Sequence, residues 1–296
     1  MKIRIGVGLG VGNTLSTPAE FGRVVDQLED LAFDSLWMSD RVTGAALDPL
    51  VALAVAAGRT RRLKLGTNVL VLPGRDPFLM ARQLAAIDQL SEGRLLPAVG
   101  LGSPSRADRA PFGVAKGTRA AAFEEALSVM RALWAEGGSV PHPDAGGKAS
   151  TIDPKPTRPL EVWFGGRSTP ALERAGRLSD GWIGSFQTPE ETGAARSVIM
   201  DAATAAGRAI DDDHFGTTLF YARTHRTELA EMVVTALSEH YVPELLLPCG
   251  EHELGEVIAQ HVTHGLTKFV LVPADRPDDW DAELTWLRRV TAPLEN

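Results

Sequence analysis

The sequence contains very little cysteine: Cys249 is the only one among 296 residues. A lone cysteine cannot form an internal disulfide, and it leaves no Cys-x-x-Cys pair for zinc binding or thiol redox chemistry. The seven histidines form no HExxH pattern, so we expect no metal site. This cysteine usage fits a reducing compartment best.

Long hydrophobic runs and an excess of positive charge are also missing. No apolar run approaches the ~20 residues that span a bilayer, and residues 1–10 lack the features of a signal peptide. The chain carries 30 Lys and Arg against 38 Asp and Glu, a formal charge of -8, which disfavours general attraction to nucleic acid or to an anionic membrane. We therefore expect a cytoplasmic protein that binds neither, and any anion site must be local.

Short apolar runs alternate with amphipathic stretches of helical length along the chain. This alternation is typical of repeated βα units around a parallel sheet. The eight predicted strands are residues 3–9, 35–38, 63–71, 95–99, 160–164, 181–185, 216–222 and 268–272. We predict one α/β domain, residues 1–296, folded as a (β/α)8 TIM barrel with loop insertions at its carboxyl-end face; an open doubly wound sheet is the alternative.

Helix start signals fall between these strands. Thr17 and Pro18 supply an N-cap and a first-turn proline, and the pattern recurs at Asp76-Pro77 and Thr188-Pro189. Further helices are predicted at about 117–136, 228–240 and 251–264. Residues 137–159 are rich in Gly, Pro, Ser and His, which predicts a long surface excursion.

In a parallel barrel the reactive groups lie just beyond the strands, at their carboxyl ends. The fifth predicted strand runs into Gly165-Gly166-Arg167-Ser168 and then a helix start. Glycines allow a phosphate to approach the backbone, the helix amino end offers free N–H groups, and Arg167 or Ser168 can add contacts. This segment is a candidate phosphate site; an ordinary strand-to-helix turn that needs glycine is the alternative.

The other candidates follow the second, third and fourth predicted strands. Thr67 and Asn68 are a polar pair inside an apolar strand, where they could meet a ligand ring or simply mark a bulge. Asp40 could hydrogen-bond a cofactor or relay a proton, although such a residue is often a loop or cap residue. The segment around Gly100 and Ser103 lacks a complete dinucleotide or triphosphate motif, and we interpret it as a pocket wall that a flat ligand can approach closely.

Four segments together resemble the luciferase-like flavin- and deazaflavin-dependent oxidoreductases. They occur in the family's order across most of the chain: SLWMSD at 35–40, GTNVLVLP at 66–73 with RDP at 75–77, DQLSEGR at 88–94 with VGLG at 99–102, and FGG at 164–166 with AGRLSDGW at 175–182. The resemblance implies a non-proline cis peptide at Asn68-Val69 that supports the cofactor ring. It also implies a cofactor phosphate at Gly165 and Gly166, and a position near the ring for Asp40.

The resemblance implies coenzyme F420 or FMN as cofactor, and the Trp-x-Ser-Asp segment and the Ala- and Arg-rich composition favour F420. F420 passes hydride and does not activate oxygen as flavin does, so we expect hydride transfer to or from a small organic substrate. Two alternatives are an FMN-dependent monooxygenase and a non-catalytic cofactor-binding relative. A homodimer formed through early helices is also implied.

The sequence departs from the family's sugar-phosphate dehydrogenases at two positions. Arg41 stands where His is common, and Ser103 stands where those enzymes carry Glu. A sugar-phosphate substrate is therefore disfavoured. Asp40 is the first candidate proton donor and Ser103 the second.

Overall fold

A computed structural model describes residues 2–9, 15, 17–43, 45–103, 105–115, 117–142 and 146–295. Residue 104, in the predicted pocket wall, and residues 143–145, in the predicted excursion, lie outside the described residues.

All eight predicted strands are confirmed, and they lie in one parallel sheet. The third and fourth are each divided in two, so the sheet has ten named strands in the order β4-β6-β9-β10-β11-β12-β1-β2-β3-β5. Their bounds are β1 Arg4–Leu9, β2 Ser35–Met38, β3 Lys64–Thr67, β4 Leu70–Val71, β5 Leu95–Leu96, β6 Ala98–Gly100, β9 Trp163–Gly165, β10 Gly181–Ser185, β11 Phe215–Tyr221 and β12 Lys268–Pro273.

The divided strands close the sheet into a barrel. Strand β3 pairs with β5, and β4 pairs with β6, so the third and fourth strands are neighbours along both of their halves. The chain passes from β3 to β4 through the cis peptide Asn68-Val69, which confirms the bond that the family resemblance implied. The strand order begins with β4-β6 and ends with β3-β5, and these are the two halves of the third and fourth strands. The sheet therefore closes on itself, which confirms the (β/α)8 barrel and excludes the open sheet.

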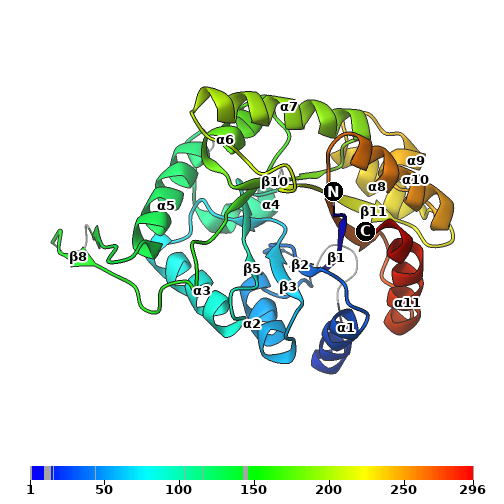
Figure 1. Cartoon of the computed structure of the whole chain (residues 1–296), viewed down its shortest axis with the longest axis horizontal. Coiled ribbons are helices and arrows are strands. Elements are labelled where there is room, and N and C mark those ends of the chain that lie inside the picture. The colour runs from blue at the N-terminus through cyan, green and yellow to red at the C-terminus, as the bar shows by residue number, and fades with distance from the viewer. Residues whose placement is uncertain are drawn as a thin grey trace.

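Helices surround the strands (Figure 1). Their bounds are α1 Pro18–Asp30, α2 Pro49–Arg59, α3 Pro77–Leu90, α4 Arg106–Arg109, η1 Ala110–Phe112, α5 Arg119–Trp134, α6 Thr169–Leu178, α7 Pro189–Ala205, α8 Glu228–Leu237, α9 Pro243–Leu246, α10 Gly250–Thr263, α11 Trp280–Thr291 and η3 Ala292–Leu294. The helix predicted to reach residue 240 ends three residues earlier, and Pro243 begins a separate turn because proline is accepted at a helix start. No helix in the described ranges is long and apolar enough to cross a membrane.

The predicted excursion at 137–159 is confirmed as a projection from the barrel. Within it, β7 Val140–Pro141 pairs antiparallel with β8 Ala149–Ser150, and Figure 1 shows this hairpin reaching away from the helix layer. Sequence alone did not predict the short α4 and η1 after β6, because four or three residues are too few to show helical periodicity.

The core divides into two clusters because side chains alternate along each strand. On β2, Leu36 and Met38 belong to one cluster and Trp37 to the other; on β12, Phe269 and Leu271 separate likewise from Val270. The cluster of Trp37 and Val270 also takes residues from β5, β9, β10 and β11, so it fills the barrel interior. The larger cluster packs the strands against the helices.

A charged network lies beside Trp37 in the barrel. Lys268, with 3% of its side chain exposed, donates to Asp34 Oδ2 at 2.7 Å, and Lys64 donates to Asp34 Oδ1 at 3.2 Å. Ser35 Oγ donates to the same carboxylate and accepts from Trp37 Nε1 at 2.8 Å. Burial alone would raise the pKa of Asp34, but the two ammonium groups outweigh it and lower this pKa from 3.8 to about 2.

We expect this network to make the fold sensitive to acid. The folded-state pKa of Asp34 is depressed, so its stabilising contribution is present above pH 3.8 and is lost as the pH falls through about 2. The expected loss in the free energy of unfolding is about 2 kcal/mol between pH 4 and pH 2. Urea unfolding at several pH values would measure it, with Asp34→Asn as the control that lacks this part of the slope. An equally steep slope in that variant would contradict the assignment.

Candidate functional site

A cavity of about 690 Å³ opens at the carboxyl ends of the strands. This volume lies within the range usual for cofactor and small-molecule sites. Its walls come from β6, β9 and β10 and from the segments that follow them, together with α5, α6 and the end of α8. The position agrees with the rule that barrel enzymes place their sites at this face.

The cavity brings together most of the residues that the sequence singled out. Those that line it are Val69, Gly100, Ser103, Gly165, Gly166, Arg167 and Ser168. Val69, between the two halves of the third strand, and the segment after the fifth strand therefore meet at one site, although about a hundred positions separate them in the sequence.

Val69 fits between two of the predicted glycines. A Cβ atom on Gly165 would lie 2.7 Å from Val69 Cγ1, and one on Gly100 would lie 2.7 Å from Val69 Cγ2. Distances this short are not tolerated between carbon atoms, so both positions need glycine to make room for the valine. Gly100 and Gly165 thus shape the cavity wall around Val69, which sequence could not distinguish from direct contact with a ligand.

We expect Gly165→Ala to destabilise the protein by about 1–3 kcal/mol, because the added methyl group collides with Val69. In a Val69→Ala background the same change should cost less than about 0.5 kcal/mol, since the colliding methyl groups are gone. Chemical denaturation of the two single variants and the double variant measures this coupling. Equal costs in both backgrounds would mean that the collision is relieved elsewhere.

The amino end of α6 forms a second wall. Gly166 has φ +117, a backbone conformation that side chains rarely allow, and Ser168 is the N-cap residue. The Ser168 side chain makes no capping hydrogen bond, so its hydroxyl is available to a ligand. The helix dipole favours an anion at this place.

The cavity is more cationic than the sequence predicted, because Arg167 was the only arginine proposed for it. Arg109, Arg119, Arg167 and Arg174 line it, and none of the described lining residues is acidic. Arg174 Nε donates to Glu124 at 2.9 Å, and Arg167 donates to the carbonyl of Leu237 and lies 3.8 Å from Glu239. Within the described part of the chain, Arg109 and Arg119 have no ion-pair partner. In a chain of charge -8, this arrangement concentrates positive charge at one cavity.

Three predicted residues lie outside the cavity wall. Thr67 is fully buried, and its hydroxyl donates to Ala98 O at 2.7 Å and accepts from Ala98 N at 3.0 Å. It therefore bridges the divided third and fourth strands and has no free group for a cofactor. Asn68 Nδ2 donates to Thr218 Oγ1 across the barrel at 2.7 Å.

Asp40, the first candidate proton donor, is held by its neighbours. Its carboxylate accepts from Val71 N at 2.9 Å and from Arg75 at 2.8 Å, and 4% of its side chain is exposed. These contacts place the backbone that follows Val69, so the geometry gives Asp40 a positioning role.

Ser103 does reach the cavity, and a buried carboxylate lies behind it. Ser103 Oγ accepts from Ser105 N at 3.1 Å. Burial would raise the pKa of Asp108, but hydrogen bonds from Thr43, the charge of Arg41 and a hydrogen bond from Ser103 hold this pKa below its ordinary value. Asp108 thus ties the segment after β2 to the segment after β6 through Thr43 and Arg41.

Two clusters of potential metal ligands lie elsewhere among the described residues. One joins Glu191, Glu239 and His240, and the other joins Asp211, Asp213 and His214. Glu239 and His240 are well exposed, and His240 already contacts Glu191. Neither cluster lines the cationic cavity.

Comparison with known proteins identifies the family. A model of the luciferase-like monooxygenase family matches residues 1–285. A phthiodiolone/phenolphthiodiolone dimycocerosates ketoreductase from Mycobacterium sp. (strain JLS) is 27% identical over 241 residues, which are 69% of this chain and 62% of that protein. The chain thus spans less than two thirds of the length of this curated relative.

Solved structures share the whole fold. An F420-dependent secondary alcohol dehydrogenase in complex with an F420-acetone adduct superposes with a TM-score of 0.81 at 17% identity, covering 100% of both chains. The oxygenating constituent of 3,6-diketocamphane monooxygenase from Pseudomonas putida, in complex with FMN, gives a TM-score of 0.74 at 16% identity, covering 100% of this chain and 99% of that one. The chain belongs to the luciferase-like monooxygenase family.

Proposed function

We propose that this protein transfers hydride between coenzyme F420 and a small organic substrate. The observation that carries the proposal is the cavity itself, which joins the Val69 wall to the amino end of α6 and to Arg109 and Arg119. The F420-dependent alcohol dehydrogenase with the same fold and the ketoreductase relative support a hydride reaction at a carbonyl or alcohol carbon. Bound F420 would supply the hydride chemistry.

The residues of this chain would bind the cofactor, orient its ring and exchange a proton with the substrate. Val69 would support one face of the ring, and the amino end of α6 with the lining arginines would hold the phosphate. Ser103 would exchange a proton with the substrate oxygen, because its hydroxyl lines the cavity and its charge environment includes Asp108. Asp40 would act indirectly by placing the backbone near Val69.

Titration with F420, FMN and riboflavin tests the proposal. We expect F420 to bind at micromolar concentration, followed by anaerobic oxidation of reduced F420 when a ketone is added. Oxygen uptake with reduced FMN and incorporation of an oxygen atom into the substrate would instead indicate a monooxygenase, the class of the FMN-bound 3,6-diketocamphane enzyme. If the protein binds neither F420 nor FMN, the proposal is wrong.

We also propose that the chain forms a homodimer through α2 and α3. Val51 and Val55, one turn apart on α2, are 66% and 48% exposed, and Leu79 on the neighbouring α3 is 61% exposed. Apolar side chains grouped on one face favour an interface over water. The two helices lie side by side in Figure 1.

Sedimentation measurements of the molecular mass test this interface in the double variant Val51→Glu with Val55→Glu. We expect this double variant to be a monomer at concentrations where the wild type is a dimer, because four carboxylates would be buried at a twofold interface. Leu229→Glu on the distant α8, at a site that is also 64% exposed, is the matched control and should leave the mass unchanged. A monomeric wild type would refute the proposal.

A further inference from the structure

Phe186 has an unusual backbone conformation for a bulky residue. Its φ is 57, in the left-handed region. Ala32 and Glu92 also have positive φ, but they follow the ends of α1 and α3, where this conformation is a common way to end a helix. Phe186 instead follows strand β10 at the carboxyl-end face of the barrel. Strained backbone conformations persist mainly at functional sites, so this side chain needs an explanation.

The Phe186 ring lies against the apolar part of the barrel mouth. It stacks on Phe220 with the ring centres 4.8 Å apart and the planes at 16°. Phe220 belongs to the interior cluster, and both Val69 and Phe186 pack against that cluster. Phe186 and Val69 both line the main cavity and both pack against this apolar cluster.

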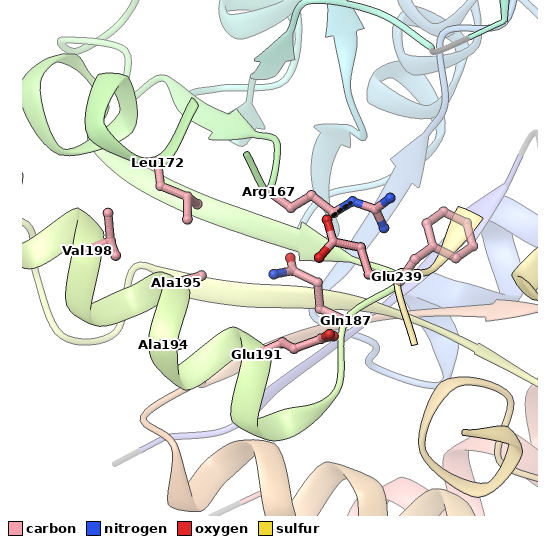
Figure 2. Close-up of a pocket in the computed structure, with 9 residues that line it drawn as sticks. Arg167, Leu172, Gln187, Glu191, Ala194, Ala195, Val198 and Glu239 are labelled. Atoms are coloured by element: carbon pink, nitrogen blue, oxygen red, sulfur yellow. Dashed lines mark ion pairs between the residues drawn. The ribbon is translucent and has the colours of Figure 1, made fainter. Parts of the chain in front are cut away.

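Phe186 also lines a second, smaller cavity of about 210 Å³ between α6 and α7. Figure 2 shows its apolar lining, formed by Leu172 on α6 and by Ala194, Ala195 and Val198 on α7. Phe186 and Arg167 line both cavities, so these two side chains separate them. An engineered apolar cavity of about 150 Å³ binds benzene, so this side cavity has room for a group of ring size.

The polar groups of the side cavity indicate an uncharged occupant. Arg167 lies beside Glu239, and Glu191 accepts from Thr188 N and contacts His240, so these charges are already partnered. Gln187 is 7% exposed, and its Oε1 is buried without a hydrogen-bond partner among the described residues. In Figure 2 the Gln187 amide points into the space below Arg167.

We propose that Phe186 determines substrate size and that the side cavity is the space it closes off. The ring packs against the apolar part of an uncharged ketone or alcohol, and it keeps longer substrates out of the pocket between α6 and α7. This inference rests on the proposed function, because the substrate is assigned to the same cavity as the cofactor.

The test compares acetone with 2-octanone in the wild type, Phe186→Ala, Phe186→Tyr, and Phe186→Ala combined with Val198→Phe. We expect Phe186→Ala to raise the preference for 2-octanone, as a ratio of kcat/KM values, by about tenfold, a factor that corresponds to the contact area of a few buried methylene groups. Phe186→Tyr should keep the wild-type preference. Filling the side cavity with Val198→Phe should remove the gain, with F420 or FMN affinity changed less than about threefold in all variants.

Ligand-observed NMR with the cofactor-free protein separates this inference from the proposed function. The same two ketones should show the same shift in preference there, even if neither cofactor binds. Absence of ketone binding to every variant overturns the inference, and so does a double variant that behaves like Phe186→Ala. A change in cofactor affinity as large as the change in ketone preference would place Phe186 in the cofactor site instead.

The backbone strain gives a second, independent measurement. Glycine adopts positive φ freely, whereas alanine does not, so Phe186→Gly should unfold at the same temperature as Phe186→Ala or higher. Ordinarily glycine in place of alanine lowers stability. A lower melting temperature for Phe186→Gly would show that the conformation is not strained, and the functional argument from strain would fail.

Discussion

Replacing both Arg109 and Arg119 with alanine should weaken binding of F420 or FMN about a hundredfold or more. These two arginines line the cationic cavity and have no ion-pair partner in the described part of the chain, so their charge is available to an anionic ligand. A hydrogen bond to a charged group contributes about 1.5–3 kcal/mol, and two such bonds correspond to at least a hundredfold in affinity. Loss of these side chains should leave the barrel core unaffected because neither belongs to it.

Riboflavin provides the decisive comparison, because it carries the same ring as FMN without the phosphate. We expect its affinity to change less than about threefold in the double variant. Arg177→Ala is the control: Arg177, on α6 beside Glu124, lies outside the cavity lining. If riboflavin and FMN lose affinity equally, the arginines contact the ring or shape the wall, and the phosphate is held elsewhere.

Asp34→Asn should lower the free energy of unfolding by about 3–5 kcal/mol. The change leaves the Lys268 ammonium buried without its carboxylate partner, and uncompensated buried charges are among the most costly defects in a fold. Burial already lowers the pKa of Lys268 from 10.5 to about 8 although Asp34 opposes the shift, so the lysine tolerates the barrel interior only with this partner. In a protein of this size the melting temperature should fall by roughly 10 °C.

The second substitution that tests this reasoning is Lys268→Met in the Asp34→Asn background. Methionine keeps much of the length of lysine without its charge, so the double variant should recover most of the lost stability. Calorimetry or urea unfolding of the single and double variants measures the recovery. A double variant no more stable than Asp34→Asn alone would show that packing, and not charge, causes the loss.

The fold was largely predictable because each strand carries its own signal. Apolar runs bounded by turn residues gave all eight strands, and the right-handed βα repeat leaves few other arrangements. The division of the third and fourth strands was not predictable in detail. It depends on the Thr67 hydroxyl, which bonds to both backbone groups of Ala98, a contact between positions 31 residues apart.

The site was predictable where the backbone itself makes it. Gly165, Gly166 and Ser168 follow from a strand-to-helix turn, and Val69 follows from the family resemblance. The side-chain components were harder to predict. Arg109 and Arg119 resemble any surface arginine in sequence, and Asp40 appears reactive until its bonds to Val71 and Arg75 are seen. The sequence did not indicate a role for Phe186, because its positive φ depends on tertiary packing and not on the neighbouring residues in the sequence.

The concentration of arginines in one cavity affects which anions can reach the protein at all. Electrostatic fields are screened within about 10 Å at ordinary ionic strength, so an approaching molecule first meets the negative exterior and senses the arginines only at the opening. We expect a single phosphate ester to be favoured over a stiff polyanion such as duplex DNA, because the arginines are gathered in one cavity of about 690 Å³ and are not spread over the surface.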